Sequence, residues 1–162
     1  MIAVDTNILV YAYRRDSRFY LGASRAIQEL AEGDGDWAIP WPCIHEFLAV
    51  VTSPRVYDPP SPFPDAFDQA SAWSESPRMA LIGEEDAHLT HLEVAAAAMN
   101  ATGIRIHDAK IAAICLSHGV RELWTVDRDF ANVPGLRTRN PLAGLEHGEG
   151  PPSSGGGPWV VN

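Results

Sequence analysis

Short apolar runs alternate along the chain with longer segments whose apolar residues recur every three or four positions. The short runs predict strands at 1–5, 37–40, 79–83, 122–127 and, as the last candidate, 135–139. The longer segments predict helices at about 8–12, 19–31, 42–51, 63–73, 86–102 and 106–119. Strands that alternate with helices predict an α/β fold with a mainly parallel sheet covered by helices on both faces.

Two of these helices have patterns that predict their packing. In the helix that begins at Pro42 almost every side chain is apolar, so the whole helix is expected to be buried. In the Ala-rich helix at about 86–102, the inward positions are expected to be Leu89, Leu92, Ala96 and Met99. Gly103 is expected to end that helix, because glycine readily adopts the left-handed conformation that often follows a last turn.

The composition favours one folded domain followed by a tail. Of the 162 residues, 46% are hydrophobic and 20% charged, as in ordinary globular proteins. We expect a domain at 1–142 and a flexible Gly/Pro/Ser-rich tail at 143–162. No apolar run approaches the ~20 residues that cross a bilayer and no signal peptide is evident, so the expected location is the cytoplasm, with no membrane partner. Cys43 and Cys115 are expected to be small buried residues, with a disulfide between them the less favoured interpretation.

The net charge of −9 argues against a generic nucleic-acid-binding protein, whose binding surface is usually basic. A strongly acidic chain instead suits a protein that uses its carboxylates, or one that has a basic partner. Eleven of the 12 basic residues are arginines and Lys110 is the one lysine, a ratio that the base composition of a genome explains more simply than a function does.

Carboxylates stand at unexpected places in this pattern. Asp5 ends the first apolar run, and Asp127 ends the run Leu-Trp-Thr-Val in the same way. Because ligands bind outside the carboxyl ends of the strands in open parallel sheets, these two side chains are expected to share one crevice. Glu46 lies on a nearly apolar helix, and Asp108 lies in the first turn of the last predicted helix.

Considered alone, most of these acids have a structural explanation. Asp5 suits the N-cap of a helix, and Asp108 gains from a helix dipole. Asp127 and its neighbour Asp129 suit a turn. Glu46 resists such an explanation, because an ionised carboxylate on an apolar helix needs a positive partner.

Taken together, the acids predict a cation site. Two like charges ~4 Å apart repel by about 4 kcal/mol at an effective dielectric constant of ~20, so clustered carboxylates must protonate, separate or bind cations. Oxygen ligands select hard cations such as Mg²⁺ or Mn²⁺, which serve phosphoryl transfer by activating a water. The histidines fit less well: His88 and His91 lack a third zinc ligand, His45 is expected to be structural, and His107 is a candidate for orienting a carboxylate or a substrate.

Four segments follow one another in a familiar order: "VDTNILVYA" at 4–12, "HEF" at 45–47, "HDAKIAA" at 107–113 and "LWTVDRDF" at 123–130. Together they resemble the PIN-domain ribonucleases, and more narrowly the VapC-type toxins of bacterial toxin–antitoxin pairs. The resemblance covers the chain from residue 1 to about 140. It implies a three-layer α/β/α PIN-like fold with a mainly parallel central sheet.

The resemblance also implies an activity and a set of site residues. The activity is Mg²⁺- or Mn²⁺-dependent hydrolysis of RNA phosphodiester bonds by a toxin endoribonuclease. Carried over by position, four acids form the catalytic and metal-binding site, with the first and third the most direct metal ligands: Asp5, Glu46, Asp108 and Asp127. Four further positions support the carboxylates or the waters of the metal: Thr6, Asn7, Thr125 and Asp129.

The implied partners are an RNA substrate, a cognate antitoxin whose Arg reaches the acids, and a second copy of the chain in a homodimer. Because the acidic net charge does not favour RNA binding, phosphate contacts are assigned to local arginines, which are Arg14, Arg15, Arg18 and Arg128. Taken singly, each of these arginines is better explained as an exposed surface residue.

Two other functions stay open on the sequence. A phosphatase of the haloacid-dehalogenase type also begins with a strand that ends in Asp, but it needs a second Asp where this chain has Asn7. A catalytically silent binding module would keep the acidic pocket only for the Arg of a partner. Failure to bind Mn²⁺ with all four carboxylates present would favour that module.

Overall fold

Five short strands form one parallel sheet in the order β3-β2-β1-β4-β5. Their bounds are β1 Ile2–Val4, β2 Trp37–Pro40, β3 Met79–Ile82, β4 Glu122–Trp124 and β5 Arg137–Arg139. The computed structural model describes residues 1–144. The tail expected at 143–162 therefore lies, from residue 145 onward, outside the described residues. The predicted parallel sheet is confirmed.

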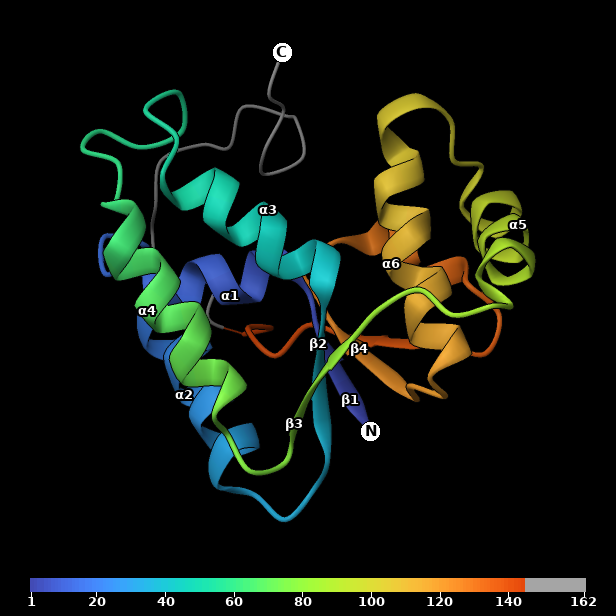
Figure 1. Ribbon diagram of the computed structural model, residues 1–162, viewed down its shortest axis with the longest axis horizontal. Coiled ribbons are helices and arrows are strands. Elements are labelled where there is room, and N and C mark those ends of the chain that lie inside the picture. Colours follow the sequence, from blue (N-terminus) through green and yellow to red (C-terminus); the bar gives the residue numbers. More distant parts are fainter. Residues whose placement is uncertain (145–162) are drawn as a thin grey trace.

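Helices cover both faces of this sheet. The helices are α1 Thr6–Tyr13, α2 Tyr20–Glu32, α3 Trp41–Val51, α4 Phe63–Ser74, α5 His88–Met99 and α6 Ile106–Ser117, with short 3₁₀ helices at η1 Gly103–Arg105 and η2 Arg128–Asn132. Figure 1 shows α1 to α4 on one side of the sheet and α5 with α6 on the other. The expected three-layer α/β/α architecture is confirmed. Among residues 1–144, no helix has the length and apolarity that crossing a bilayer requires.

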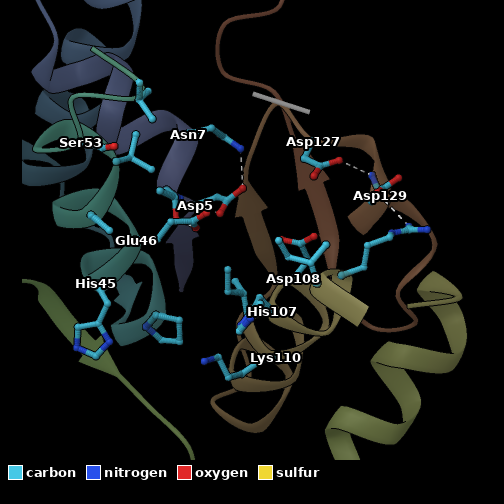
Figure 2. Close-up of a pocket in the computed structure, with 18 residues that line it drawn as sticks. Asp5, Asn7, His45, Glu46, Ser53, His107, Asp108, Lys110, Asp127 and Asp129 are labelled. Carbon is cyan, nitrogen blue, oxygen red and sulfur yellow. Dashed lines mark hydrogen bonds and ion pairs between the residues drawn. The ribbon is translucent and has the colours of Figure 1, made fainter. Parts of the chain in front are cut away.

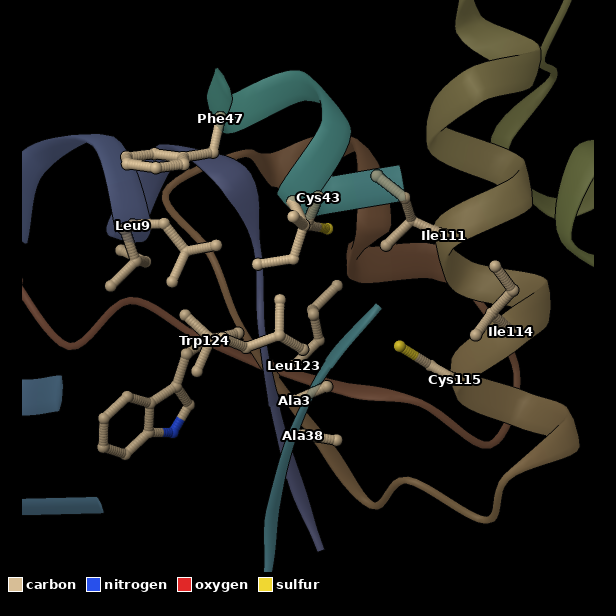
Figure 3. Packing of buried hydrophobic residues seen from close by; sticks show 14 of the residues in the cluster. Ala3, Leu9, Ala38, Cys43, Phe47, Ile111, Ile114, Cys115, Leu123 and Trp124 are labelled. Carbon is tan, nitrogen blue, oxygen red and sulfur yellow. The ribbon is translucent and has the colours of Figure 1, made fainter. Parts of the chain in front are cut away.

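The core lies between the central strands and the helices on either face (Figure 3). Ala3 and Ala38 pair across β1 and β2, and both are fully buried. α6 packs on this part of the sheet with Ile114 and Cys115, which are also fully buried. Burying one large aliphatic side chain contributes about 1.5–3 kcal/mol, so this face holds α6 firmly against the sheet. Cys43 and Cys115 are both buried and free, as the sequence indicated.

Two expectations about α5 are wrong. The helix ends at Met99, because Asn100 takes the left-handed conformation (φ 48°), three residues before Gly103, where the end was expected. Asn accepts this conformation more readily than other non-glycine residues do. Leu89 was expected to face inward but is 77% exposed, since α5 buries its later residues Ala95 and Met99 instead.

The expectation that α3 is wholly buried is also wrong. One face of this helix is open, and it carries Trp41, His45, Glu46 and Ala49. Its opposite face is buried through Cys43, Phe47 and Val51. Apolar residues on all sides of a helix do not indicate which side meets solvent, so the orientation of Glu46 could not be predicted.

The strand order brings the ends of β1 and β4 together. From β1 the chain adds β2 and β3 on one side of the sheet, and later β4 and β5 on the other. The order therefore reverses between β1 and β4, which is where ligands bind in open parallel sheets. The N–H of Asp5 donates to the Trp124 carbonyl at 3.0 Å, so the segments that follow β1 and β4 leave the sheet side by side. The strand predicted at 122–127 accordingly stops at Trp124, and its last residues turn into this crevice.

Candidate active site

A cavity of about 730 Å³ lies at this edge of the sheet, and the sequence-predicted acids line it (Figure 2). They are Asp5, Glu46, Asp108, Asp127 and Asp129. Thr6 and Asn7 line the cavity as well, and Thr125 lies behind them against Asp5. The structure thus brings together side chains from the end of β1, from α3, from the start of α6 and from the segment that follows β4.

Asp5 is the buried centre of this group, with only 4% of its surface exposed. It is the N-cap of α1, and its Oδ1 accepts the Thr6 N–H at 2.7 Å. Its Oδ2 accepts the Asn7 side-chain amide at 2.7 Å and the Thr125 hydroxyl at 2.6 Å. The N-cap explanation and the location in the cavity therefore both hold for this residue.

The surroundings of Asp5 work against its ionised form. Burial raises the pKa of Asp5 to about 7, and the charges of Glu46 and Asp108 add to that rise. The hydrogen bonds from Thr125 and from the Thr6 N–H act in the opposite direction and lower the pKa. A positive charge in the cavity would restore the ionised carboxylate near neutral pH, because opposite charges favour the charged form.

A polar network behind Asp5 holds the other side of the crevice. The Asn7 side-chain amide also donates to the Thr125 hydroxyl at 3.0 Å, and its carbonyl oxygen accepts the Val126 N–H at 3.3 Å. The Thr125 hydroxyl oxygen accepts the Asp127 N–H at 3.0 Å. Asn7 is therefore used to orient its neighbours, in a position where a phosphatase of the haloacid-dehalogenase type would need a second acid.

Glu46 reaches the cavity from the open face of α3. Its Oε2 accepts the Thr6 hydroxyl at 2.6 Å, which links α3 to the start of α1. The sequence suggested a buried carboxylate in need of a positive partner, and that expectation is wrong, because Glu46 is exposed to the cavity. Solvent and the Thr6 hydroxyl satisfy the group instead.

Asp108 faces Glu46 and Asp127 from the first turn of α6, where it is half-buried. Burial raises the pKa of Asp108 to about 6, and the charges of Asp127, Glu46 and Asp129 raise it further, in that order. Arg105 acts in the opposite direction. The acids of this cavity therefore affect one another, and their combined negative charge exceeds the positive charge available to them.

Asp127 and Asp129 lie in the turn that leads into η2. Asp127 is the N-cap of this short helix, and its Oδ1 accepts the Asp129 N–H at 2.8 Å. Asp129 forms an ion pair with Arg105 at 3.0 Å. Asp129 is therefore the acid whose charge is already matched, whereas Asp127 makes no ion pair within residues 1–144.

The donor set fits a hard divalent cation in its chemistry, because every acid in the cavity presents oxygen. Among residues 1–144, no three side chains of Asp, Glu, His or Cys lie close enough together to hold one metal ion between them. Mg²⁺ does not need such a cage, since it keeps several of its waters and is often bound through one or two carboxylates. Asp5 and Asp108 are suited to that mode, because burial first, and the charges of neighbouring acids after it, already disfavour their ionised forms.

Sequence analysis missed most of the nitrogen-bearing residues of the cavity. Arg105, Lys110 and His45 line it together with His107, for which a substrate-orienting role was expected. The signal was present in the spacing, because Arg105 and Lys110 flank Asp108 within one helical turn. The arginines proposed for phosphate contacts do not line the cavity: Arg15, Arg18 and Arg128 are exposed elsewhere, and Arg14 is largely covered.

Comparison with known proteins gives matches over most of the chain. The family model of the PIN domain matches residues 2–136. The chain is 33% identical over 147 residues to VapC ribonuclease Mb2897 of Mycobacterium bovis, covering 91% of this chain and 99% of that protein. It is 28% identical over 140 residues to Ribonuclease VapC48 of Mycobacterium tuberculosis, covering 86% of this chain and 97% of that protein.

Solved structures show the same fold at lower identity. One is VapBC2 from Rickettsia felis bound to a promoter DNA fragment, with a TM-score of 0.61, 19% identity, and 86% of this chain and 98% of that chain covered. Another is FitAcB from Neisseria gonorrhoeae, with a TM-score of 0.62, 16% identity, and 88% and 99% covered. At these identities the likeness supports the architecture and the connectivity of the sheet.

Proposed function

The chain belongs to the PIN-domain family, and from this premise we propose that it is a divalent-metal-dependent endoribonuclease that acts as the toxin of a toxin–antitoxin pair. One observation supports the assignment of this activity to the acidic cavity. Four acids that are far apart in the sequence meet in one cavity at the switch point of the sheet: Asp5, Glu46, Asp108 and Asp127. The names of the relatives, VapC ribonucleases, supply the class of substrate.

In this proposal Asp5 and Asp108 hold Mg²⁺ or Mn²⁺, with Glu46 and Asp127 completing the acidic lining. A bound cation of this kind supplies Lewis acidity, which makes a water more nucleophilic and offsets charge on the phosphate oxygens. Charge matching is the reason for the assignment, since burial and neighbouring acids raise the pKa values of Asp5 and Asp108 as long as nothing positive is near.

The polar residues around Asp5 prepare the site before the substrate arrives. Asn7 and Thr125 bind the same oxygen of Asp5, so the carboxylate is held in one orientation. Thr6 binds both Asp5, through its N–H, and Glu46, through its hydroxyl. Because these groups are already ordered, the reaction does not lose entropy in ordering them.

The hydrolysis also needs a group that takes the proton of the attacking water. Glu46 is suited to this role because it is exposed to the cavity, and because Thr6 occupies Oε2 while Oε1 has no hydrogen-bond partner within residues 1–144. A carboxylate within hydrogen-bond reach of the water can act as the general base. The water oxygen then bonds to phosphorus while the bond to one ribose oxygen breaks, and that oxygen takes a proton from solvent, which divides the RNA strand.

The proposal includes two protein partners. An antitoxin that places an Arg among the acids would match their unbalanced charge, and guanidinium groups pair well with carboxylates. A second copy of the chain would cover exposed apolar side chains such as Leu89 and Val94 on α5. These exposed residues and the acidic cavity are the support for both partners.

The proposed activity is tested by incubating the purified chain with a single-stranded RNA and, separately, with a small phosphate ester. We expect cleavage of the RNA with Mg²⁺ or Mn²⁺, no cleavage after chelation, and no turnover of the ester. Turnover of the ester alone would support a phosphatase. Absence of both Mn²⁺ binding and RNA cleavage would support the silent binding module.

A further inference from the structure

Lys110 is the one lysine of the chain, and it lines the acidic cavity from α6. It follows His107 by three positions, so both side chains lie on the same face of the helix. Figure 2 shows Lys110, His107 and His45 along one side of the cavity, apart from Asp127 and Asp129. Lys110 therefore lies in the same part of the cavity as the two histidines, away from Asp127 and Asp129.

The charge of Lys110 has no partner in the part of the chain that the structure describes. Within residues 1–144 its ammonium group makes no ion pair or hydrogen bond, although five carboxylates line the same cavity. The other cation of the cavity, Arg105, is paired with Asp129 at 3.0 Å. Lys110 is half-buried and forms part of the cavity wall.

We propose that Lys110 binds a phosphate of the RNA strand next to the phosphate that is cut, an inference that rests on the proposed ribonuclease function. An RNA strand that enters the cavity brings charged phosphates on both sides of the scissile bond, and in this proposal the scissile phosphate lies at Asp5 and Asp108. Lysine binds phosphate as a point charge. With a net charge of −9, the chain repels RNA overall, so one unpaired cation at this position has a large effect on binding.

His107 and His45 support the same path for the strand. Both are exposed and both line the cavity, so their ring nitrogens are available to a strand that passes Lys110. The His45 ring lies against the ring of Trp41, with centroids 5.8 Å apart, which limits where His45 can turn. The phosphate contact of Lys110 then sets the register of the RNA, because contacts to the backbone position a nucleic acid independently of its sequence.

The test compares Lys110→Gln and Lys110→Arg with the native chain in the cleavage of a labelled single-stranded RNA of random sequence, at several salt concentrations. Arg25→Gln is the matched control, because it removes one exposed positive charge from α2, away from the cavity. For Lys110→Gln we expect KM to rise roughly tenfold while kcat changes less than about twofold. The slope of log KM against log salt should fall by about 0.7, the value for one phosphate contact to a single strand. Lys110→Arg should stay near the native values.

Three results would overturn the inference while leaving the proposed function in place. The first is a Lys110→Gln variant that matches Arg25→Gln in KM and in salt slope. The second is a fall in kcat with KM unchanged, which would assign Lys110 to the chemical step. The third is an altered sedimentation coefficient without a change in KM, which would assign Lys110 to a carboxylate of a second copy. If the native chain does not cleave RNA, the proposed function fails, and binding of the same RNA by fluorescence anisotropy still decides the role of Lys110.

Discussion

The Thr125 hydroxyl donates a 2.6 Å hydrogen bond to Oδ2 of Asp5 across 120 positions of the chain. This bond joins the end of β1 to the segment that follows β4, at the point where the strand order of the sheet reverses. Burial raises the pKa of Asp5, and the Thr125 bond is the strongest influence that lowers it. Thr125 therefore helps a buried carboxylate to remain ionised and available to a cation.

Replacing Thr125 by Val keeps the shape of the side chain and removes this donor. We expect the free energy of unfolding to fall by about 1–3 kcal/mol, because an acceptor on a buried acid and the Asp127 N–H lose their partner. Thr125→Ser, which keeps the hydroxyl, is the matched control. Urea unfolding at roughly pH 8 measures both variants. Equal stability of the Val and Ser variants would contradict the role assigned to the hydroxyl.

The raised pKa of Asp5 predicts how stability depends on pH. The pKa is about 7 in the folded chain and 3.8 in its ordinary state, so between these values the folded protein binds more protons than the unfolded chain. The free energy of unfolding therefore decreases as pH rises from about 4 to 7, and levels off above that range. Asp108, with its pKa raised to about 6, acts in the same direction.

Urea unfolding of chelator-treated protein across this pH range measures the effect. Asp5→Asn should flatten the profile, because an amide does not titrate. Mg²⁺ or Mn²⁺ should raise the melting temperature more above pH ~7 than near pH ~5, since protons compete with the cation for the carboxylates. A stability that increases from pH ~4 to ~7 in the metal-free native chain would contradict the prediction.

Asp108→Asn should separate the chemistry of the site from its stability. Asp108 is half-buried and its side chain makes no hydrogen bond within residues 1–144, so the variant should fold normally. RNA cleavage should fall on the order of 10²-fold or more, as expected when an electrostatic contribution to the transition state is lost. Asp68→Asn, at an exposed position of α4, is the control and should cleave RNA as the native chain does. Undiminished cleavage by folded Asp108→Asn would contradict the assignment.

Arg14 and Arg15 are adjacent in the chain, but the structure gives their side chains different surroundings. The Arg14 side chain is 11% exposed, pairs with Asp16 at 2.6 Å, and lies 3.8 Å from the centre of the Tyr57 ring. It also donates to the Pro59 carbonyl and to the Ser61 hydroxyl, and thereby ties the proline-rich loop to the end of α1. Arg14 is therefore a structural residue, where the sequence had suggested a phosphate contact or an exposed position.

Arg14→Ala should lower the free energy of unfolding by about 1–3 kcal/mol and make the loop at 52–62 more sensitive to proteolysis. Arg15→Ala removes an exposed side chain and should change stability by less than about 0.5 kcal/mol. Chemical unfolding and limited proteolysis of the two variants check this difference. Similar values for both would show that the contacts of Arg14 contribute little.

The parts of the fold that were predictable depend on local patterns. Periodicity predicted the alternation of strands and helices, and the rule for parallel strands predicted that Asp5 and Asp127 lie at one edge of the sheet. The roles expected for Asn7 and Thr125 came from the resemblance of the segments around them. Their hydrogen bonds to Asp5 agree with a supporting role.

The rest depends on tertiary contacts that one sequence does not contain. α3 has apolar residues on all sides, so only its packing decides that Glu46 faces the cavity. Arg105, the last residue of η1 and the N-cap of α6, pairs with Asp129 because α6 and η2 meet in space, and nothing in either segment indicates the partner. Leu89 was misplaced for the same reason, since α5 contacts α6 over only part of the face that its periodicity suggested.

Binding of Mn²⁺ near neutral pH, followed by electron paramagnetic resonance, tests the central claim most directly. The claim is that Asp5 and Asp108 hold a divalent cation for RNA hydrolysis in a cavity that acids from four segments line. We predict that the native chain and Asp68→Asn bind Mn²⁺ alike, and that Asp5→Asn and Asp108→Asn each lose at least about tenfold in affinity and lose RNA cleavage with it. Mn²⁺ binding of native strength by folded Asp5→Asn and Asp108→Asn would contradict the claim.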